Sequence, residues 1–139
     1  MIVLDTNVIS ELMKKNAEPS VLAWIAGADP GEFVTTSITR AEILLGVMLL
    51  PEGRRRSTLE IEARRILADF GSGGVLSFGE EAAEQFVTIV AHRRGTGRPI
   101  DPLDAQIAAI ARAHRARLAT RNVRDFEDCG VSLIDPWAA

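Results

Sequence analysis

Short apolar runs alternate with helical segments along this chain, and this alternation constrains its fold more than any other sequence feature. The runs expected to form strands are IVL (2–4), which has the pattern of a strand covered on both faces, EFVTT (32–36), VLSF (75–78), RLAT (117–120) and VSLI (131–134), the last as a short edge strand. The segments between them carry apolar residues at helical spacing. Strands that alternate with helices form mostly parallel sheets with helices on both faces. We therefore expect an α/β fold with three layers, α/β/α, and a mostly parallel sheet of about five strands.

The expected helices have recognisable first and last residues. Their ranges are about 5–14, 19–28, 37–50, 53–70, 80–94 and 101–115. Pro19 suits the first turn of its helix, and Asp101 followed by proline suits an N-cap and first helical position. Ser37 is the expected N-cap of the third helix, because serine is among the preferred caps. The fourth helix is expected to stop in GSGG (71–74).

Length and composition favour one soluble domain spanning residues 1–139. The chain is 47% apolar and 25% charged, which is an ordinary mixture for a globular protein. No apolar stretch reaches the roughly 18 residues that a membrane span needs. The first residues lack the basic region of a signal peptide. We therefore expect a cytoplasmic protein with no membrane partner.

Charge and cysteine content narrow the function classes. A single cysteine excludes an internal disulfide. The net charge of −3 argues against a general nucleic-acid binder. Of the 16 basic residues, however, only Lys14 and Lys15 are lysines. Clustered arginines suit phosphate oxygens, although a solvated helix face explains any one pair equally well.

Polar residues cluster where the expected strands end. In open parallel sheets, ligands bind outside the carboxyl ends of the strands. The acidic and amide residues expected at that edge are Asp5, Glu42, Asp101, Asp104, Asn122 and Asp125. Each acid also has a structural explanation when it is taken alone. Asp5 is a suitable N-cap, Asp104 suits a capping box, and Asp125 suits a turn.

Glu42 is harder to explain as a structural residue. It shares a helical stripe with Leu45 and Leu49, so its carboxylate is expected to be desolvated. An ion pair with Arg40 or Arg93 is one explanation. A metal ion is the other, and we favour it because other acids are expected at the same edge. Packed carboxylates repel one another unless a cation offsets their charge.

The donor set points to a hard divalent cation. Oxygen ligands without cysteine suit Mg²⁺ or Mn²⁺. Both histidines, His92 and His114, are expected on the surface, and no serine or cysteine triad is apparent. A metal-activated water is then the remaining nucleophile, and phosphodiester hydrolysis is the natural reaction.

Several motifs carry a resemblance to a known family. In order, LDTNVISEL, SITRAEILLGV, DPLDAQIAAIA, LATRNVRDF and DPW resemble the PIN-domain ribonucleases, and within them the VapC-type toxins of the FitB-like branch. The resemblance covers nearly the whole chain. It implies a PIN-like fold and an Mg²⁺- or Mn²⁺-dependent endoribonuclease that hydrolyses RNA with metal-activated water. It also implies a VapB-type antitoxin partner and a homodimer.

The resemblance also assigns residues. Asp5, Glu42 and Asp104 fall on the metal-site acids of the family. Asn122 departs from the pattern, because many members carry aspartate there, and Asp125 is close enough to substitute for it. Both are included among the expected catalytic residues, whereas Asp101 is expected to be an N-cap. The residues expected to contact the substrate are Thr6, Asn7, Thr120 and Arg121.

Two binding features follow from apolar residues. The first two helices carry more of them than one buried face needs, namely Ile9, Leu12, Met13, Leu22, Trp24 and Ile25. The surplus is consistent with a groove for an antitoxin helix. Aromatic residues make up only 5% of the chain, so few base-stacking platforms are expected.

Three other functions were weighed against this one, and the first two lack a residue that they require. A receiver-like regulatory module needs a phosphoacceptor aspartate after the middle strand and a later lysine, and neither is present here. A phosphatase of the haloacid-dehalogenase kind needs an acid at the position of Asn7. A PIN domain with weak or no activity, acting mainly as a partner-binding module, remains open because of Asn122.

Overall fold

The computed structural model describes residues 1–70 and 74–139, which form an α/β fold around one parallel sheet. The strands are β1 (Ile2–Leu4), β2 (Phe33–Thr36), β3 (Val75–Leu76), β4 (Arg117–Ala119) and β5 (Leu133–Ile134). Their order across the sheet is β3-β2-β1-β4-β5, and all four pairings are parallel. The expected parallel sheet is therefore confirmed, with β1 at its centre and β5 at one edge.

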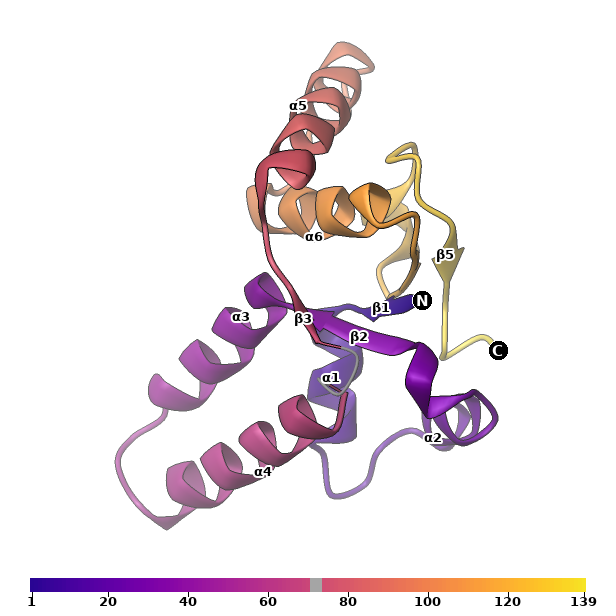
Figure 1. Cartoon of the computed structure of the whole chain (residues 1–139). Coiled ribbons are helices and arrows are strands. Elements are labelled where there is room, and N and C mark those ends of the chain that lie inside the picture. The colour runs from indigo at the N-terminus through magenta and orange to yellow at the C-terminus, as the bar shows by residue number, and fades with distance from the viewer. Residues whose placement is uncertain (71–73) are drawn as a thin grey trace.

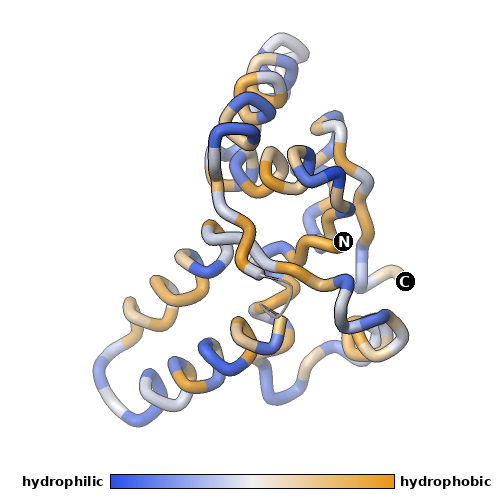
Figure 2. Tube along the Cα trace, viewed as in Figure 1, coloured by the Kyte–Doolittle hydropathy of each residue, from blue (hydrophilic) through white to orange (hydrophobic). Residues whose placement is uncertain are grey.

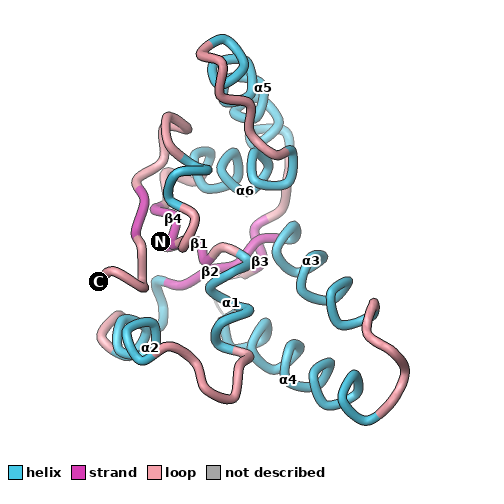
Figure 3. Tube along the Cα trace, turned by 180° about the vertical axis from the view of Figure 1, so that it is seen from behind, coloured by secondary structure: helices cyan, strands magenta, loops and turns pink. Residues whose placement is uncertain are grey.

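Helices cover both faces of the sheet. They are α1 (Thr6–Leu12), α2 (Pro19–Ala26), α3 (Ser37–Met48), α4 (Arg54–Phe70), α5 (Glu80–Gly95) and α6 (Pro102–Ala113), with short 3₁₀ helices η1 (Pro30–Glu32) and η2 (Val123–Phe126). Helices α1 to α4 lie on one face, and α5 and α6 lie on the other (Figures 1 and 3). The expected three-layer arrangement is confirmed. No helix in the described ranges is both long and apolar enough to cross a bilayer.

Two apolar cores pack against the two faces of the sheet. Val3 and Val34 belong to the core under α5 and α6. Ile2, Leu4 and Phe33 belong to the core under α1 to α4. Successive strand residues point to opposite faces, so a sheet covered on both sides needs continuous apolar strands. The hydrophobic colouring of the central strands follows this requirement (Figure 2).

The helix caps agree with the sequence at two positions and differ at one. The Asp101 side chain accepts hydrogen bonds from the first turn of α6, and Pro19 is the first residue of α2, as predicted. The prediction that Ser37 caps α3 is wrong, because Ser37 is already helical. Thr36 keeps the extended backbone of β2, and its Oγ1 accepts from the Thr39 N–H at 3.0 Å. The predicted stop of α4 in GSGG falls on residues 71–73, which lie outside the described residues.

Helices α3 and α4 lie side by side and extend away from the sheet (Figures 1 and 3). Their outward sides carry exposed apolar residues, with Leu45 and Met48 of α3 and its C-cap Leu49 exposed by 58%, 52% and 75%. Ile61 of α4 is 71% exposed. The apolar composition of α3 therefore reflects an uncovered surface as well as a buried face.

Candidate active site

A cavity of about 370 Å³ opens beside the carboxyl ends of β1 and β4. Its lining residues are Asp5, Thr6, Asn7, Ser10, Glu11, Lys14, Glu42, Asp104, Arg121, Asn122 and Trp137. We call it the acid cavity. Asp5 follows β1, Glu42 lies in α3 and Asp104 lies in the first turn of α6. Three acids that are distant in sequence thus line one space, as the parallel topology predicts.

Asp5 is the most buried of these acids, with 4% of its surface exposed. Its Oδ1 accepts from the Thr6 N–H at 2.8 Å, and its Oδ2 accepts from the Thr120 hydroxyl at 2.8 Å. Burial raises the pKa of Asp5, while these two hydrogen bonds oppose the rise. Asp5 also caps α1. Within residues 1–70 and 74–139 it forms no ion pair.

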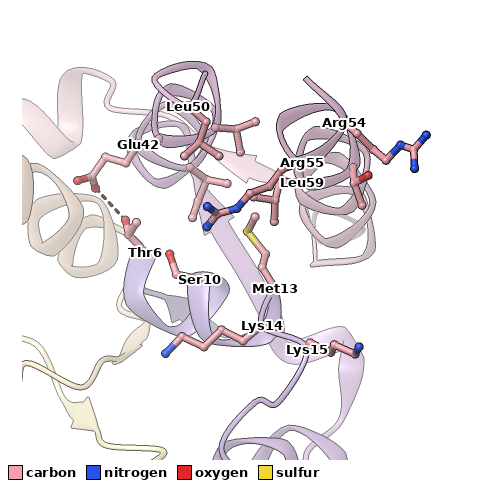
Figure 4. A pocket seen from close by; sticks show the side chains of 14 residues that line it. Thr6, Ser10, Met13, Lys14, Lys15, Glu42, Leu50, Arg54, Arg55 and Leu59 are labelled. Atoms are coloured by element: carbon pink, nitrogen blue, oxygen red, sulfur yellow. Dashed lines mark hydrogen bonds between the residues drawn. The ribbon is translucent and has the colours of Figure 1, made fainter. Parts of the chain in front are cut away.

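Thr6 connects Asp5 to Glu42. Its backbone N–H binds Asp5, and its Oγ1 donates to Glu42 Oε1 at 2.8 Å (Figure 4). The same hydroxyl lies 3.2 Å from Thr39 Oγ1 on α3. One threonine at the start of α1 therefore sets the relative position of two carboxylates.

Glu42 occupies a more open environment than its sequence neighbours suggest. The expectation of a desolvated carboxylate in a buried stripe is wrong, because Glu42 is half-buried and both Leu45 and Leu49 are exposed. The reason is that α3 projects from the sheet beside α4. The described residues also show no ion pair between Glu42 and Arg40 or Arg93. The Glu42 carboxylate instead lines the acid cavity.

Asp104 is half-buried, and its pKa is raised to about 7. Burial is the main cause, followed by the negative charges of Asp5, Asp101, Asp125 and Glu42. The acid cavity thus concentrates negative charge that a proton or a cation would relieve.

Three of the predicted substrate-contact residues, Asn7, Thr120 and Arg121, are joined by hydrogen bonds next to the acids. Thr120 is fully buried, and its Oγ1 accepts from the Asn122 N–H at 3.0 Å and from Asn7 Nδ2 at 3.4 Å. Asn7 Oδ1 in turn accepts from the Arg121 N–H at 3.3 Å. The loop that follows β4 is therefore held against α1. Thr120 does not line the cavity and acts through Asp5.

The two candidates for a fourth polar ligand lie in different places. Asn122 is exposed and lines the acid cavity. Asp125 is exposed on η2 and does not line it. The charge of Asp125 still raises the pKa of both Asp5 and Asp104. By position, Asn122 is thus the better candidate for a fourth ligand. Asp125 affects Asp5 and Asp104 only through its charge.

Sequence reasoning missed four residues that line the cavity: Ser10, Glu11, Lys14 and Trp137. Ser10 and Lys14 follow Thr6 at intervals of four along α1 and just beyond it, so helical periodicity would have found them. Glu11 is 5% exposed and accepts from Lys14 Nζ at 3.0 Å, which lowers its pKa. Only the DPW motif hinted at Trp137.

The donor set fits a hard divalent cation. Asp5 is a buried carboxylate without an ion-pair partner among the described residues, and Asp104 has a strongly raised pKa. In the described ranges, no three acidic, histidine or cysteine side chains are close enough to chelate an ion by themselves. Mg²⁺ is commonly bound by one or two carboxylates and keeps several waters. Asp5 and Asp104 together with water meet that requirement.

A second, mostly apolar cavity of about 900 Å³ adjoins the first between α1, α3 and α4. We call it the apolar cavity. Met13, Leu50 and Leu59 lie around it, and Arg54 points away from its centre (Figure 4). Both cavities are lined by Thr6, Ser10, Lys14 and Glu42. A molecule that fills the apolar cavity would therefore reach the acids.

Comparison with known proteins identifies the family. The PIN domain model matches residues 2–130. The chain belongs to the PIN domain family. It is 37% identical to VapC ribonuclease Y4jK of Sinorhizobium fredii, over 99% of this chain and 98% of that protein. It is 33% identical to Toxin FitB of Neisseria gonorrhoeae, over 99% of each.

A solved structure agrees with this assignment. The crystal structure of FitAcB from Neisseria gonorrhoeae contains a chain that matches this PIN domain with a TM-score of 0.92 and 34% identity, covering 100% of both chains. The expected resemblance to VapC-type and FitB-like proteins is confirmed.

Proposed function

We propose that this PIN domain chain is a metal-dependent endoribonuclease and the toxin of a type II toxin–antitoxin system. The observation that carries the proposal is the acid cavity, which Asp5, Glu42 and Asp104 line together without a basic ion-pair partner in the described ranges. The names of the relatives, VapC ribonuclease Y4jK and Toxin FitB, support the same activity.

Asp5 and Asp104 would hold Mg²⁺ or Mn²⁺, with Glu42 as a further ligand or as the group that orients the attacking water. The bound cation supplies positive charge that activates water and offsets the charge of the phosphodiester. Thr6 and Thr120 hold the Asp5 carboxylate in one orientation. Thr6 also holds Glu42, so the two acids face the substrate in a fixed arrangement. Arg121, which lines the acid cavity, would bind the RNA backbone.

The direct test is cleavage of single-stranded RNA by the purified chain with Mg²⁺ or Mn²⁺. Asp5→Asn and Asp104→Asn each remove one charge at constant size, and we expect each to lower the rate at least about 100-fold. Asp101→Asn is the matched control. It removes a nearby charge but keeps a good N-cap for α6, so its rate should stay close to that of the wild type.

Equal rates in all these proteins would contradict the assigned roles. Absence of cleavage by the wild type, when no antitoxin is bound, would favour the alternative of an inactive PIN domain that mainly binds partners. Calorimetric Mn²⁺ titration separates the two cases, because Asp5→Asn should weaken Mn²⁺ binding whether or not RNA is cleaved.

We infer that a VapB-type antitoxin is the partner of this chain and that part of it occupies the apolar cavity. The lining residues that the two cavities share, Thr6 and Glu42 among them, support this inference, because an occupant of the apolar cavity would then lie against the acid cavity. Co-purification with the cognate antitoxin should abolish RNA cleavage. Gly46 lines the apolar cavity and has open space around it, so Gly46→Trp should weaken this inhibition without removing an acid. Undiminished inhibition would place the antitoxin elsewhere.

We also propose a homodimer. The exposed apolar residues Leu45, Met48 and Leu49 on α3 offer a surface that a second copy would cover. A monomeric mass in light scattering at micromolar concentration would rule it out.

A further inference from the structure

Arg121 and Trp137 form a stacked pair at the rim of the acid cavity. The guanidinium carbon of Arg121 lies 5.3 Å from the centre of the Trp137 ring, and both residues line the cavity. The pair results from the sheet order. Strands β4 and β5 are parallel neighbours, so the residues that follow them meet at the same edge.

Core packing and a backbone hydrogen bond hold Trp137 in place, and a backbone hydrogen bond holds Arg121. The Trp137 side chain is half-buried and packs against the core under α1 to α4, and its backbone N–H donates to Asp135 Oδ1 at 2.9 Å. The Arg121 backbone N–H donates to Asn7 Oδ1. Asn7 in turn contacts Thr120, which binds Asp5. The backbone of Arg121 is therefore linked through Asn7 and Thr120 to the most buried acid.

The guanidinium of Arg121 has N–H donors that can bind a ligand. It is exposed, and in the described part of the chain no carboxylate forms an ion pair with it. A guanidinium that lies on an indole keeps its in-plane N–H groups free for phosphate oxygens. Its outer face is a surface on which an unpaired nucleobase can stack. These two properties together match one nucleotide of a single strand.

We propose that Arg121 and Trp137 bind one unpaired nucleotide of the RNA next to the phosphate that is cleaved. The phosphate of this nucleotide lies on the arginine fork, and its base stacks on the arginine–tryptophan pair. The inference rests on the proposed ribonuclease function and gives that site a requirement for unpaired bases. It also revises the expectation of few stacking platforms, because one of the two tryptophans lies at the cavity.

The first test measures binding without cleavage. In an Asp5→Asn, Trp24→Phe protein, Trp137 is the only tryptophan, and its fluorescence reports on the stack. A short oligoadenylate should quench this fluorescence. It should also bind about tenfold more tightly than an abasic ribose-phosphate strand of equal length, within the range that base stacking contributes.

Substitutions separate stacking from charge. Arg121→Lys keeps the charge but loses the planar fork, so the preference for bases over the abasic strand should disappear. Arg124→Lys is the matched control. It changes another exposed arginine that does not line the cavity, and it should keep the preference. If Arg121→Lys also keeps it, the proposed stack is wrong.

The second test uses the active enzyme. Arg121→Lys and Trp137→Leu should each raise KM for single-stranded RNA about tenfold with little change in kcat, because the pair binds the substrate and does not touch the reacting atoms. Trp137→Phe keeps a ring and should give an intermediate KM even if Trp137→Leu folds poorly.

The outcomes distinguish this inference from the proposed function. Normal RNA cleavage with unchanged KM in Arg121→Lys and Trp137→Phe would overturn the nucleotide site and leave the ribonuclease intact. Absence of RNA cleavage by the wild type would overturn the ribonuclease. In that case, equal binding of oligoadenylate and abasic strand would overturn the nucleotide site as well.

Discussion

Asp5 shows how one residue serves the fold and the candidate site together. It ends β1, caps α1 and presents a buried carboxylate to the acid cavity. Its position after an apolar run made both roles predictable. Its main side-chain partner was not predictable from local pattern, because Thr120 lies 115 positions further along the chain. Only the pairing of β1 with β4 brings the two together.

Asp104 makes the stability of the metal-free protein depend on pH. Its pKa is about 7 in the folded protein and near 3.8, the ordinary value of an aspartate, in the unfolded chain, so the folded state binds more protons between these values. Stability from this group is therefore fully present below about pH 4 and is lost as pH rises through 7. Asp104→Asn should raise the melting temperature at pH 8 in EDTA and change it much less at pH 5.

Thermal unfolding of both proteins at the two pH values checks this prediction. Asp101→Asn removes a neighbouring charge, preserves the cap hydrogen bonds and leaves the Asp104 carboxylate in place, so it should raise the melting temperature at pH 8 by much less. If Asp104→Asn lowers the melting temperature at pH 8, the ionised Asp104 carboxylate does not destabilise the folded protein, and the prediction is wrong.

Glu42 illustrates the limit of reading burial from a helix sequence. The apolar residues around it predicted a desolvated carboxylate, yet Leu45 and Leu49 are exposed. Periodicity indicates which residues share a face, but the neighbouring element determines whether that face is covered. Here α4 covers only part of α3.

At the scale of elements, α5 holds the loop that follows β4 through a buried arginine. Arg93 is 4% exposed, and its Nη1 donates to the carbonyl oxygens of Asp125 and Glu127, each at 2.9 Å. Its Nε donates to the Arg98 carbonyl at 2.6 Å. The sequence placed Arg93 among possible partners of Glu42. The structure assigns it to η2, which carries Asp125.

Arg93→Met keeps most of the aliphatic stem but leaves these three carbonyl groups without their donor. We expect a loss of about 3 kcal/mol in the free energy of unfolding, because three partly buried carbonyl groups lose hydrogen bonds to a charged donor. Urea denaturation measures it. The neighbouring Arg94 is exposed, so Arg94→Met should stay within about 0.5 kcal/mol of the wild type. Equal midpoints for the two variants would contradict the role of Arg93.

The position of the Trp137 side chain could not be predicted from the sequence. The strand before it was predicted, and so was its position at the sheet edge. The segment after β5 has no periodic pattern, so nothing indicated that its indole would reach Arg121. Short irregular segments are positioned by tertiary contacts, which explains why the cavity was predicted more fully on its acidic side.

At the scale of the whole molecule, the alternation of strands and helices was sufficient to predict the layers and the parallel sheet. Strand lengths were less predictable. VLSF forms a strand only at Val75–Leu76, and VSLI only at Leu133–Ile134. Edge strands have fewer partners, so their ends depend on a single neighbour. The topology was nevertheless enough to predict that Asp5, Glu42 and Asp104 would lie at one edge of the sheet, where they line one cavity.

We propose that this shared edge of the sheet binds a divalent ion. Anomalous diffraction from crystals soaked in Mn²⁺ would show whether it does. We predict a peak in the acid cavity, roughly 2.1 Å from carboxylate oxygens of Asp5 and Asp104, with Glu42 in direct or water-mediated contact. Ordered density for all three acids without a peak between Asp5 and Asp104 would contradict the account.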